Sequence, residues 1–301
     1  MPKKVLVVLI GDADGRPVDL YQEAQGRHAA QEGRTAGVDV EVTWATSFDQ
    51  YGAVRRRLAA SPVDAVVAEP ASLATAGLVL KNLQGRTGVV LLNAWDEMFE
   101  PYLANWGEGL PIGAISQPQE EIGRIQGRQL SAAVPPGGGV LLVTGPTRAS
   151  AARERLAGLR ATLRSDVSLH TTEAGEWTES FGILAFNSWY SVFRTRREEI
   201  HAIAGHSDDL AVGASKGGAA AANADHARMF AKAMIFGVGA VAGYGKEMVD
   251  GGRIRASVAV RPNAGLAVSL LARFWTTREP LPGHSTSEAV AYPVSSASAA
   301  A

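Results

Sequence analysis

The chain has 301 residues, of which 46% are hydrophobic and 20% charged, as expected of a folded protein large enough for two α/β lobes. Its net charge of −1 argues against a nucleic-acid-binding surface as the main function. The lack of cysteine excludes disulfides and thiolate metal sites. Because the six histidines show no ligand spacing either, we expect no metal and no cofactor.

The first predicted element is a buried strand at 5–10, which follows two lysines. The apolar run is only six residues long, too short for the core of a secretory signal peptide. It is followed by Gly11 and Asp12 rather than by a convincing cleavage site. No other stretch of the sequence is long and apolar enough to span a membrane.

Strands and helices then alternate along the chain. The first half is predicted to hold strands at 38–45, 65–69, 89–92 and 112–115, helices at 20–36, 49–60, 73–83 and 119–134, and an aromatic loop at 93–102. The pattern restarts after a Pro-Gly turn, with strands at 140–144, 167–173, 199–204, 233–238 and 254–260, and helices at 150–164, 178–196, 208–224, 243–251 and 263–276. The tail from Pro280 is predicted as a loop with one late strand at 289–292. This alternation predicts parallel sheets covered on both faces, in two similar lobes with a cleft between them.

The segment 145–158 is the most informative of the chain. It follows an apolar strand and opens a helix that Ser150 is placed to cap. Arg153 then lies in the first helical turn, where the helix dipole favours anions rather than cations. This turn is also beside a strand end, where α/β sheets bind their ligands. Arg153 is therefore either a ligand contact or a solvated surface arginine.

Four blocks of sequence, at 123–129, 145–158, 206–214 and 237–258, make the chain resemble the type I periplasmic binding proteins, the sugar-binding relatives of ribose-binding protein. Ser-Ala-Ala-Arg-Glu-Arg at 150–155 matches the ribose-binding pattern closely, and Asp-Asp-Leu-Ala-Val-Gly at 208–213 is similar to a second pattern of the family. Gly-Glu-Trp at 175–177 and Pro-Asn-Ala-Gly at 262–265 extend the match. The order and spacing of these blocks, rather than any one of them, carry the resemblance over most of the chain.

The resemblance implies an α/β fold of two doubly wound parallel-sheet lobes, joined by three crossovers, that close like a hinge on a small ligand. It places the first lobe at 1–116 plus 261–283 and the second at 117–260 plus 284–301. It also implies a sugar or related polyol as ligand, an ABC-transporter permease or a membrane sensor protein as partner, and a location in the periplasm or cell envelope. Nucleic acid is not among the implied partners.

Among the site residues, the resemblance matches Arg153 to a ligand-binding arginine, whose forked guanidinium suits paired hydroxyls or a carboxylate. The usual polar anchors of the family are replaced by Asn93 with Ala94, by Ser207, by Gly239 and by Val260. Each lost polar contact costs about 1–3 kcal/mol. Either the ligand is not ribose, or other residues compensate, or sugar binding has been lost.

Several residues are candidate compensators. Asp12 and Asp14 follow the first strand and either contact ligand or form an Asx turn. The aromatic rings of Tyr21, Trp95 and Trp177 either stack on a sugar ring or pack within a lobe. The remaining candidates are Asn93 after the fourth strand, Ser116 at a crossover, which contacts ligand or turns the chain, and Ser207, for which a helix cap is the simpler role.

The sequence thus favours a solute-binding protein for a small polyhydroxylated ligand of an ABC transporter. The alternative is a ligand-sensing regulatory domain of the same fold that acts on a kinase or another signalling partner. An enzyme is not expected, because no set of nucleophile, acid and base emerges from the sequence.

Overall fold

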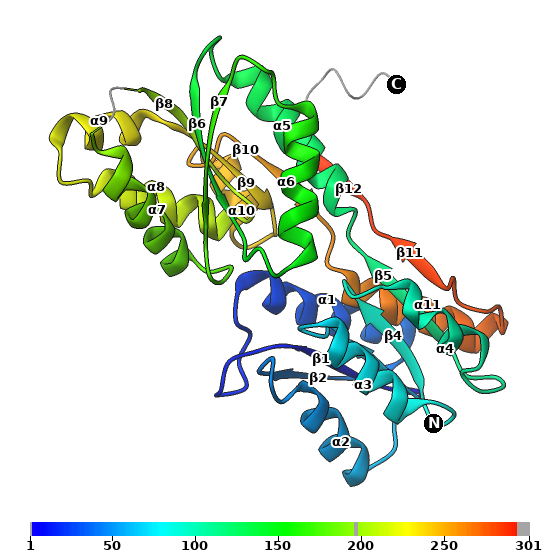
Figure 1. Cartoon of the computed structure of the whole chain (residues 1–301). Helices are drawn as coiled ribbons and strands as arrows, with labels where there is room; N and C mark the ends of the chain where they lie inside the picture. The colour runs from blue at the N-terminus through cyan, green and yellow to red at the C-terminus, as the bar shows by residue number, and fades with distance from the viewer. Residues whose placement is uncertain (1, 196–197, 294–301) are drawn as a thin grey trace. The chain divides into compact units, whose positions relative to one another are not determined.

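A computed structural model describes residues 2–195 and 198–293 of the chain (Figure 1). The chain divides into two compact units, Met1–Gln117 with Pro262–Ser287 and Pro118–Arg261 with Glu288–Ala301. Each unit is an α/β layer structure of the predicted fold class, with one six-stranded sheet covered by helices.

The first unit contains β1 (Lys4–Ile10), α1 (Leu20–Ala36), β2 (Asp39–Ala45), α2 (Gln50–Ala60), β3 (Ala65–Ala68), α3 (Leu73–Leu83), β4 (Gly88–Leu92), η1 (Glu97–Phe99), α4 (Glu100–Ala104), β5 (Ile112–Ser116), α11 (Asn263–Thr277) and β11 (His284–Thr286). Its strands are ordered β11-β5-β4-β3-β1-β2. All of these strands pair in parallel, so their carboxyl ends lie at one edge of the sheet.

The second unit contains α5 (Gln119–Ala133), β6 (Gly139–Thr144), α6 (Ser150–Thr162), β7 (Ser168–Glu173), α7 (Glu179–Phe193), β8 (Ile200–Gly205), α8 (Asp208–Ala219), α9 (Ala224–Lys232), β9 (Met234–Gly239), α10 (Gly245–Asp250), β10 (Ala256–Val260) and β12 (Ala289–Tyr292). Its strands are ordered β12-β10-β9-β8-β6-β7. Only the late strand β12 runs antiparallel to its neighbour among the described strands.

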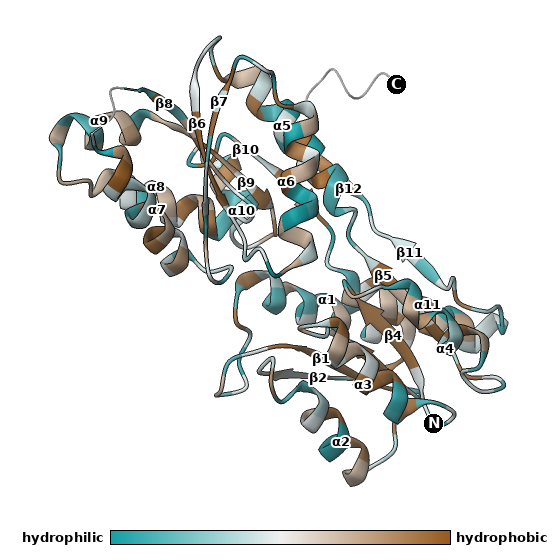
Figure 2. Cartoon of the chain, in the orientation of Figure 1, coloured by the Kyte–Doolittle hydropathy of each residue, from teal (hydrophilic) through white to brown (hydrophobic). Residues whose placement is uncertain are grey.

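Both sheets are buried on both faces, which explains the apolar strands of the sequence (Figure 2). In the first unit, α2 and α3 cover one face and α1 and α11 cover the other. In the second unit, α7, α8 and α9 cover one face and α5 and α6 the other. Side chains alternate between these faces along the central strands, so that Leu6 and Val8 of β1 lie in one core of the first unit and Val5 and Val7 in the other.

Two glycines of the resembling blocks let α5 and α6 pack closely. A Cβ atom on Gly123 would come within 2.0 Å of the Arg155 carbonyl oxygen, and one on Gly158 within 1.9 Å of the Glu120 carbonyl oxygen. Any larger residue at either position would push the helices apart. The close contact fixes the start of α6, and with it Arg153 and Arg155, against α5.

The structure differs from the predicted elements in four places. The aromatic loop contains η1 and α4, and the helix predicted at 208–224 ends at Ala219, so that α9 forms a separate helix. Helix α7 ends at Phe193, before its predicted end at 196, which lies outside the described residues. The tail contains β11, which pairs with β5 and so moves the third boundary from the expected Gly283 to after Ser287.

Within the described ranges, no helix has the length and apolar character needed to cross a membrane.

Candidate functional site

The strand order of the first sheet reverses between β1 and β3, and the carboxyl ends of these two strands lie side by side. In open α/β sheets, ligands bind at such a switch point. The chain places buried polar groups there. Glu69 directly follows β3, while Gln22 and Gln25 extend from the start of α1, which follows β1.

The Glu69 carboxyl is the centre of a network of side-chain amides. Its Oε1 accepts a hydrogen bond from Asn93 Nδ2 at 2.8 Å, and its Oε2 accepts from Gln22 Nε2 at 3.0 Å and from Gln25 Nε2 at 3.3 Å. We call Glu69 and these three amides the switch-point network. The Glu69 backbone carbonyl also accepts from Gln50 Nε2 at 2.7 Å, which fixes the residue at the strand end.

Asn93, a candidate ligand residue, orients this network. Its backbone has a positive φ of 55°, a conformation that asparagine tolerates better than most residues. Its Oδ1 accepts hydrogen bonds from the Gln117 backbone N–H at 3.2 Å and from Asn263 Nδ2 at 3.1 Å. The Asn93 amide thus links three segments of the first unit and aims its N–H at Glu69.

Tyr21 joins the same network at its edge. Its hydroxyl oxygen accepts hydrogen bonds from Gln25 Nε2 at 2.9 Å and from Gln117 Nε2 at 2.5 Å. The phenol is therefore part of a polar cluster, which differs from the expectation of a ring used only for stacking or packing.

Burial dominates the electrostatics of the switch-point network. Only 7% of Glu69 is exposed, and burial raises the pKa of its carboxyl to about 7. The hydrogen bonds from Asn93 and Gln22 lower that pKa, while the nearby Asp19 carboxylate raises it. In the part of the chain that the structure describes, no basic side chain pairs with Glu69. The carboxyl therefore exchanges between its two protonation states near neutral pH.

The predicted residues after β1 form a turn. Asp12 Oδ1 accepts hydrogen bonds from the backbone N–H groups of Asp14 and Arg16, both at 2.9 Å. The side chain of Asp12 thus makes the Asx turn that was the alternative to ligand contact. Asp14 is exposed on the same turn.

Trp95 and Ser116 both contact β11. The Trp95 ring stacks on the imidazole of His284, with ring centres 5.1 Å apart, and meets Phe99 edge to face. The Ser116 hydroxyl lies 3.0 Å from His284 Nε2. Each of the two side chains therefore packs on one side against other residues of the first unit, although both remain partly exposed.

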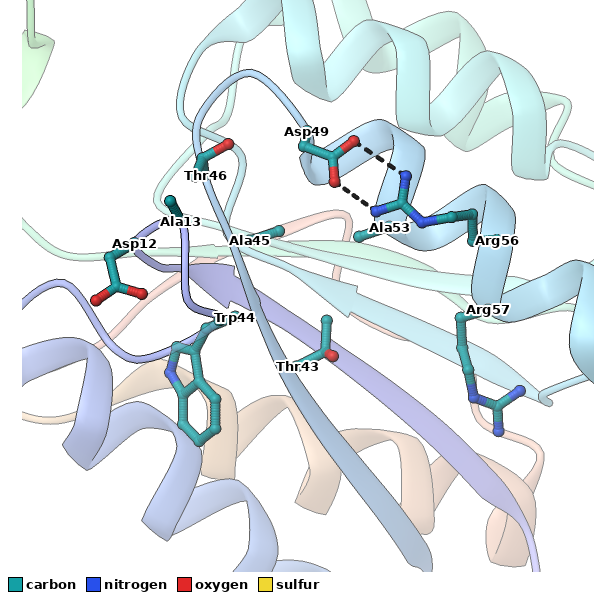
Figure 3. A pocket seen from close by; sticks show the side chains of 11 residues that line it. Asp12, Ala13, Thr43, Trp44, Ala45, Thr46, Asp49, Ala53, Arg56 and Arg57 are labelled. Carbon is teal, nitrogen blue, oxygen red and sulfur yellow. Dashed lines mark hydrogen bonds and ion pairs between the residues drawn. The ribbon is translucent and has the colours of Figure 1, made fainter.

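An open pocket of about 390 Å³ lies against β2, the edge strand of the first sheet (Figure 3). Asp12 is the one candidate site residue among those that line it. Figure 3 shows its guanidinium–carboxylate contact, in which Arg56 binds both oxygens of Asp49. Arg57 is likewise paired, through its Nε, with Glu41 at 2.7 Å. Since its arginines are already paired and the pocket lies beside the edge strand, it is a weaker candidate than the switch point.

In the second unit, the two arginines of the 150–155 block have different environments. Arg153 is exposed, and its Nη1 donates to the Thr147 carbonyl oxygen at 2.7 Å. Arg155 is buried, and it donates from Nε to Gln119 Oε1 at 2.7 Å and from Nη1 to the His206 carbonyl oxygen. The predicted cap is wrong: Ser150 is the first residue of α6, and the cap residue Ala149 has no side-chain hydrogen bond.

Trp177 is partly buried and packs against the hydrophobic core of the second unit. The Arg155 guanidinium carbon is 5.4 Å from the centre of its ring, a cation–π distance. A Cβ atom on Gly145 would come within 2.2 Å of the same ring, so only glycine permits this approach. Gly145 and Arg155 thus hold the indole at the carboxyl end of β6.

Ser207 caps α8, since its Oγ accepts a hydrogen bond from the Leu210 N–H at 3.1 Å. The next residue, Asp208, is buried and accepts from Ser257 Oγ and from the Ala240 N–H, both at 2.7 Å. Burial raises the pKa of Asp208 to about 6, against the hydrogen bonds and the field of Arg155.

His206 precedes this cap and is fully buried, so it is a structural residue rather than an exposed part of a binding surface. Burial, followed by the charge of Arg155, lowers the pKa of its imidazole to about 3. His206 is therefore neutral at physiological pH.

Three of the residues that replace the family anchors, Ala94, Gly239 and Val260, bring no polar side chain to either sheet edge. Ala94 and Val260 are buried apolar residues, and Gly239 has a φ of 134° that favours glycine. The sequence analysis predicted Asn93 but missed its partners in the first unit, Glu69, Gln22 and Gln25. It also assigned no role to the buried Arg155 of the second unit. A carboxylate directly after the apolar run 65–68 was the signal for Glu69, since strand ends are where α/β sheets place functional groups.

Comparison with known proteins supplies the family. The model of the family described as "Periplasmic binding protein domain" matches residues 19–276. Because this match covers most of the chain, the chain belongs to the periplasmic binding protein family, and the resemblance inferred from the sequence is confirmed. The family is one of non-enzymatic solute-binding proteins. No curated protein matches the chain in sequence.

Solved structures share the fold at low identity. The periplasmic ribose ABC transporter of Conexibacter woesei is 18% identical, with 96% of this chain and 91% of that chain covered and a TM-score of 0.72. An ABC transporter solute-binding protein of Mycobacterium smegmatis, with bound glycerol, is 16% identical, with 99% and 96% covered and a TM-score of 0.76. The fructose-binding periplasmic domain of a hybrid two-component system is 18% identical, with 96% and 90% covered and a TM-score of 0.74.

Proposed function

We propose that the chain is a solute-binding protein that captures a small polyhydroxylated ligand, a sugar other than ribose or a related polyol, for an ABC transporter. The observation that carries the proposal is the switch-point network of the first unit, where one carboxyl and three amides gather at the carboxyl edge of the sheet. Planar polar groups of this kind pair with adjacent hydroxyls and fix the orientation of a ligand.

The second unit supports the proposal through Arg153. Its exposed guanidinium stands at the start of α6, at the position that the resemblance assigns to a ligand-binding arginine. We further propose ligand contacts from Trp177 and from the remaining candidates, Asp12, Asp14, Asn93, Trp95, Ser116 and Ser207. Ligand capture then works by closure, which is favoured to the extent that the closed state binds the ligand more tightly than the open state.

The family supports a location in the periplasm or cell envelope, with a transporter permease as the partner. A sensor domain that reports ligand to a membrane signalling protein is the second candidate, because one solved neighbour is the periplasmic domain of a hybrid two-component system. Flanking genes for a permease and an ATPase support the transporter role, whereas a flanking histidine kinase gene supports the sensor role.

A thermal-shift panel of pentoses, hexoses, polyols, sugar acids and amino sugars tests the proposed function. A ligand at 100 times its dissociation constant adds about 2.7 kcal/mol of stability, which raises the melting temperature of a chain of this size by a few degrees. The alanine variant of Arg153 should then lose about 100-fold in affinity, since hydrogen bonds to a charged group contribute roughly 1.5–3 kcal/mol each.

The matched control is Arg148→Ala, which removes an exposed arginine of the turn before α6 that is paired with Glu176. We expect this control to bind like the wild type. Equal affinity of the Arg153→Ala and wild-type proteins for a ligand found in the panel would remove Arg153 from the site. A well-folded protein that responds to no member of the panel would contradict the proposed function.

A further inference from the structure

Glu69 is a buried carboxyl whose hydrogen bonds are satisfied but whose charge is not. Its side chain meets three neutral amides and, within the described ranges, no Lys, Arg or His at ion-pair distance. Buried carboxylates are ordinarily paired with a cation, because a lone charge in a low-dielectric site is costly. The network therefore orients the carboxyl but contributes no positive charge to balance it.

The charges around Glu69 increase the need for a cation. The ionisable group whose field acts on it is Asp19, which caps α1 and is itself acidic. Lys4 lies at the amino end of β1, the opposite edge of the sheet from the carboxyl end of β3. On α1, Arg27 is paired with Glu23. The other titratable group of the cluster is the Tyr21 phenol, which reaches Glu69 through Gln25.

The position of Glu69 gives this unbalanced charge a functional meaning. It stands at the switch point, where a ligand of this fold class is expected to arrive. A divalent metal ion does not fit, since the described residues contain no group of three or more His, Asp or Glu side chains placed to hold one. A hydroxyl brings a hydrogen bond but no charge, whereas a protonated amine brings both.

We propose that the polyhydroxylated ligand carries a protonated amino group, and that Glu69 recognises this group. The inference rests on the proposed function, because it assigns a substrate class to the same site. The amides of Gln22, Gln25 and Asn93 are positioning groups, which hold the two carboxylate oxygens in a fixed orientation. The ligand is thus an amino sugar or an amino polyol rather than a neutral sugar.

Matched ligand pairs test this assignment. Affinities for glucosamine and glucose, galactosamine and galactose, and 1-amino-1-deoxysorbitol and sorbitol are measured by calorimetry near neutral pH. In at least one pair, the amine should bind about tenfold tighter or more. The variant Glu69→Gln, which keeps the size of the side chain, should abolish that preference, so that the amine and its neutral partner bind with affinities within about twofold of each other. The control Glu108→Gln removes an exposed carboxylate of the same unit and should keep the preference.

A second readout does not depend on the variant. The Glu69 carboxyl is partly protonated near neutral pH, so an incoming ammonium must displace its proton. Titrations in two buffers of different ionisation enthalpy should therefore show proton release on binding of the amine and none on binding of the neutral sugar. A purely structural carboxyl would show no release with either ligand.

The outcomes of these experiments distinguish failure of the amine assignment at Glu69 from failure of the proposed function. Neutral sugars that bind as tightly as their amines, or an amine preference that survives Glu69→Gln, would overturn the assignment and leave the proposed function intact. Amine binding without proton release would also overturn it. A panel in which neither amines nor neutral sugars bind would contradict the proposed function, and the assignment with it.

Discussion

The two units place a buried carboxyl at the end of the corresponding strand but surround it differently. In the first unit, Glu69 follows β3, which lies beside β1; in the second, Asp208 lies just beyond β8, which lies beside β6. Glu69 is met by neutral amides, whereas Asp208 lies in the field of the buried Arg155 and accepts from a hydroxyl and a backbone N–H. The same topology thus yields one site whose charge is balanced within the unit and one whose charge is not.

The comparison shows that topology selects the place of a functional group but not its partner. Both sheets have their switch point between equivalent strands, so that polar residues gather there in each. The partner depends on which helix delivers a side chain. Helix α6 brings an arginine to the second site, while α1 brings glutamines to the first.

Among the changes considered, loss of Arg155 should have the largest effect on the free energy of unfolding. The variant Arg155→Met removes the hydrogen-bond donor to Gln119 and to the His206 carbonyl oxygen and also the positive field at Asp208. We expect a loss of about 3 kcal/mol in the free energy of unfolding, measured by urea denaturation, because a buried charge network loses one partner. The matched control Arg153→Met, at an exposed position, should change stability by less than about 0.5 kcal/mol. Similar losses in both variants would show that burial does not distinguish the two arginines.

The pH dependence of stability should separate the two carboxyls. The pKa of Glu69 is raised from 4.5 to about 7 in the folded protein, so its native form prefers the proton. Its contribution to stability is complete below pH 4.5 and is lost as the pH rises through 7, by about 3 kcal/mol over the whole window. The pKa of Asp208 is raised from 3.8 to about 6, which places its loss at lower pH.

The measurement is urea denaturation of Glu69→Gln, Asp208→Asn and wild-type protein across these windows. His206 acts in the opposite direction, because its neutral native form loses stability as the pH falls from 6.5 through 3. The difference curves between each variant and the wild type remove that contribution. Parallel curves for Glu69→Gln and wild type between pH 4.5 and 7 would contradict a raised pKa at Glu69.

The smallest expected effect concerns the helices that begin at the edge of the second sheet. Ser207→Ala removes a side-chain cap from α8 and should cost about 1 kcal/mol in thermal or urea unfolding. Ser150→Ala is the matched control, since Ser150 caps no helix and should change stability by less than about 0.5 kcal/mol. Equal losses in the two variants would mean that the cap bond of Ser207 contributes nothing of its own.

Much of the fold was predictable from local sequence. The apolar runs at 5–10 and 140–144 predict buried parallel strands, and the helix predicted at 20–36 has those bounds in the structure, where Gly37 ends it in the left-handed conformation that glycine favours. The predictions failed where tertiary contacts decide local structure. Residues 284–286 form a strand only because β5 offers an open edge, which no local pattern in the tail reveals.

The candidate site was less predictable, for a related reason. Arg153 and Ser207 could be proposed as candidates because they stand in motifs with recognisable spacing, whereas Arg155 lies two residues from Arg153 and has the opposite burial. The helical periodicity that separates those two arginines becomes meaningful only once α5 and α6 are packed. Glu69 and Gln25 are 44 positions apart, so their contact depends on the pairing of β1 with β3.

The alternation of strands and helices and the arginine motif could be predicted without a structure, because each depends on residues that are neighbours along the chain. The family could be predicted too, because the order and spacing of the four blocks are properties of the sequence. The tertiary structure alone decided which polar side chains are buried together and which of them has a counter-charge. Burial and pairing depend on segments that meet only when the sheet forms, and it is this meeting that sets the pKa of Glu69 apart from that of an ordinary glutamate.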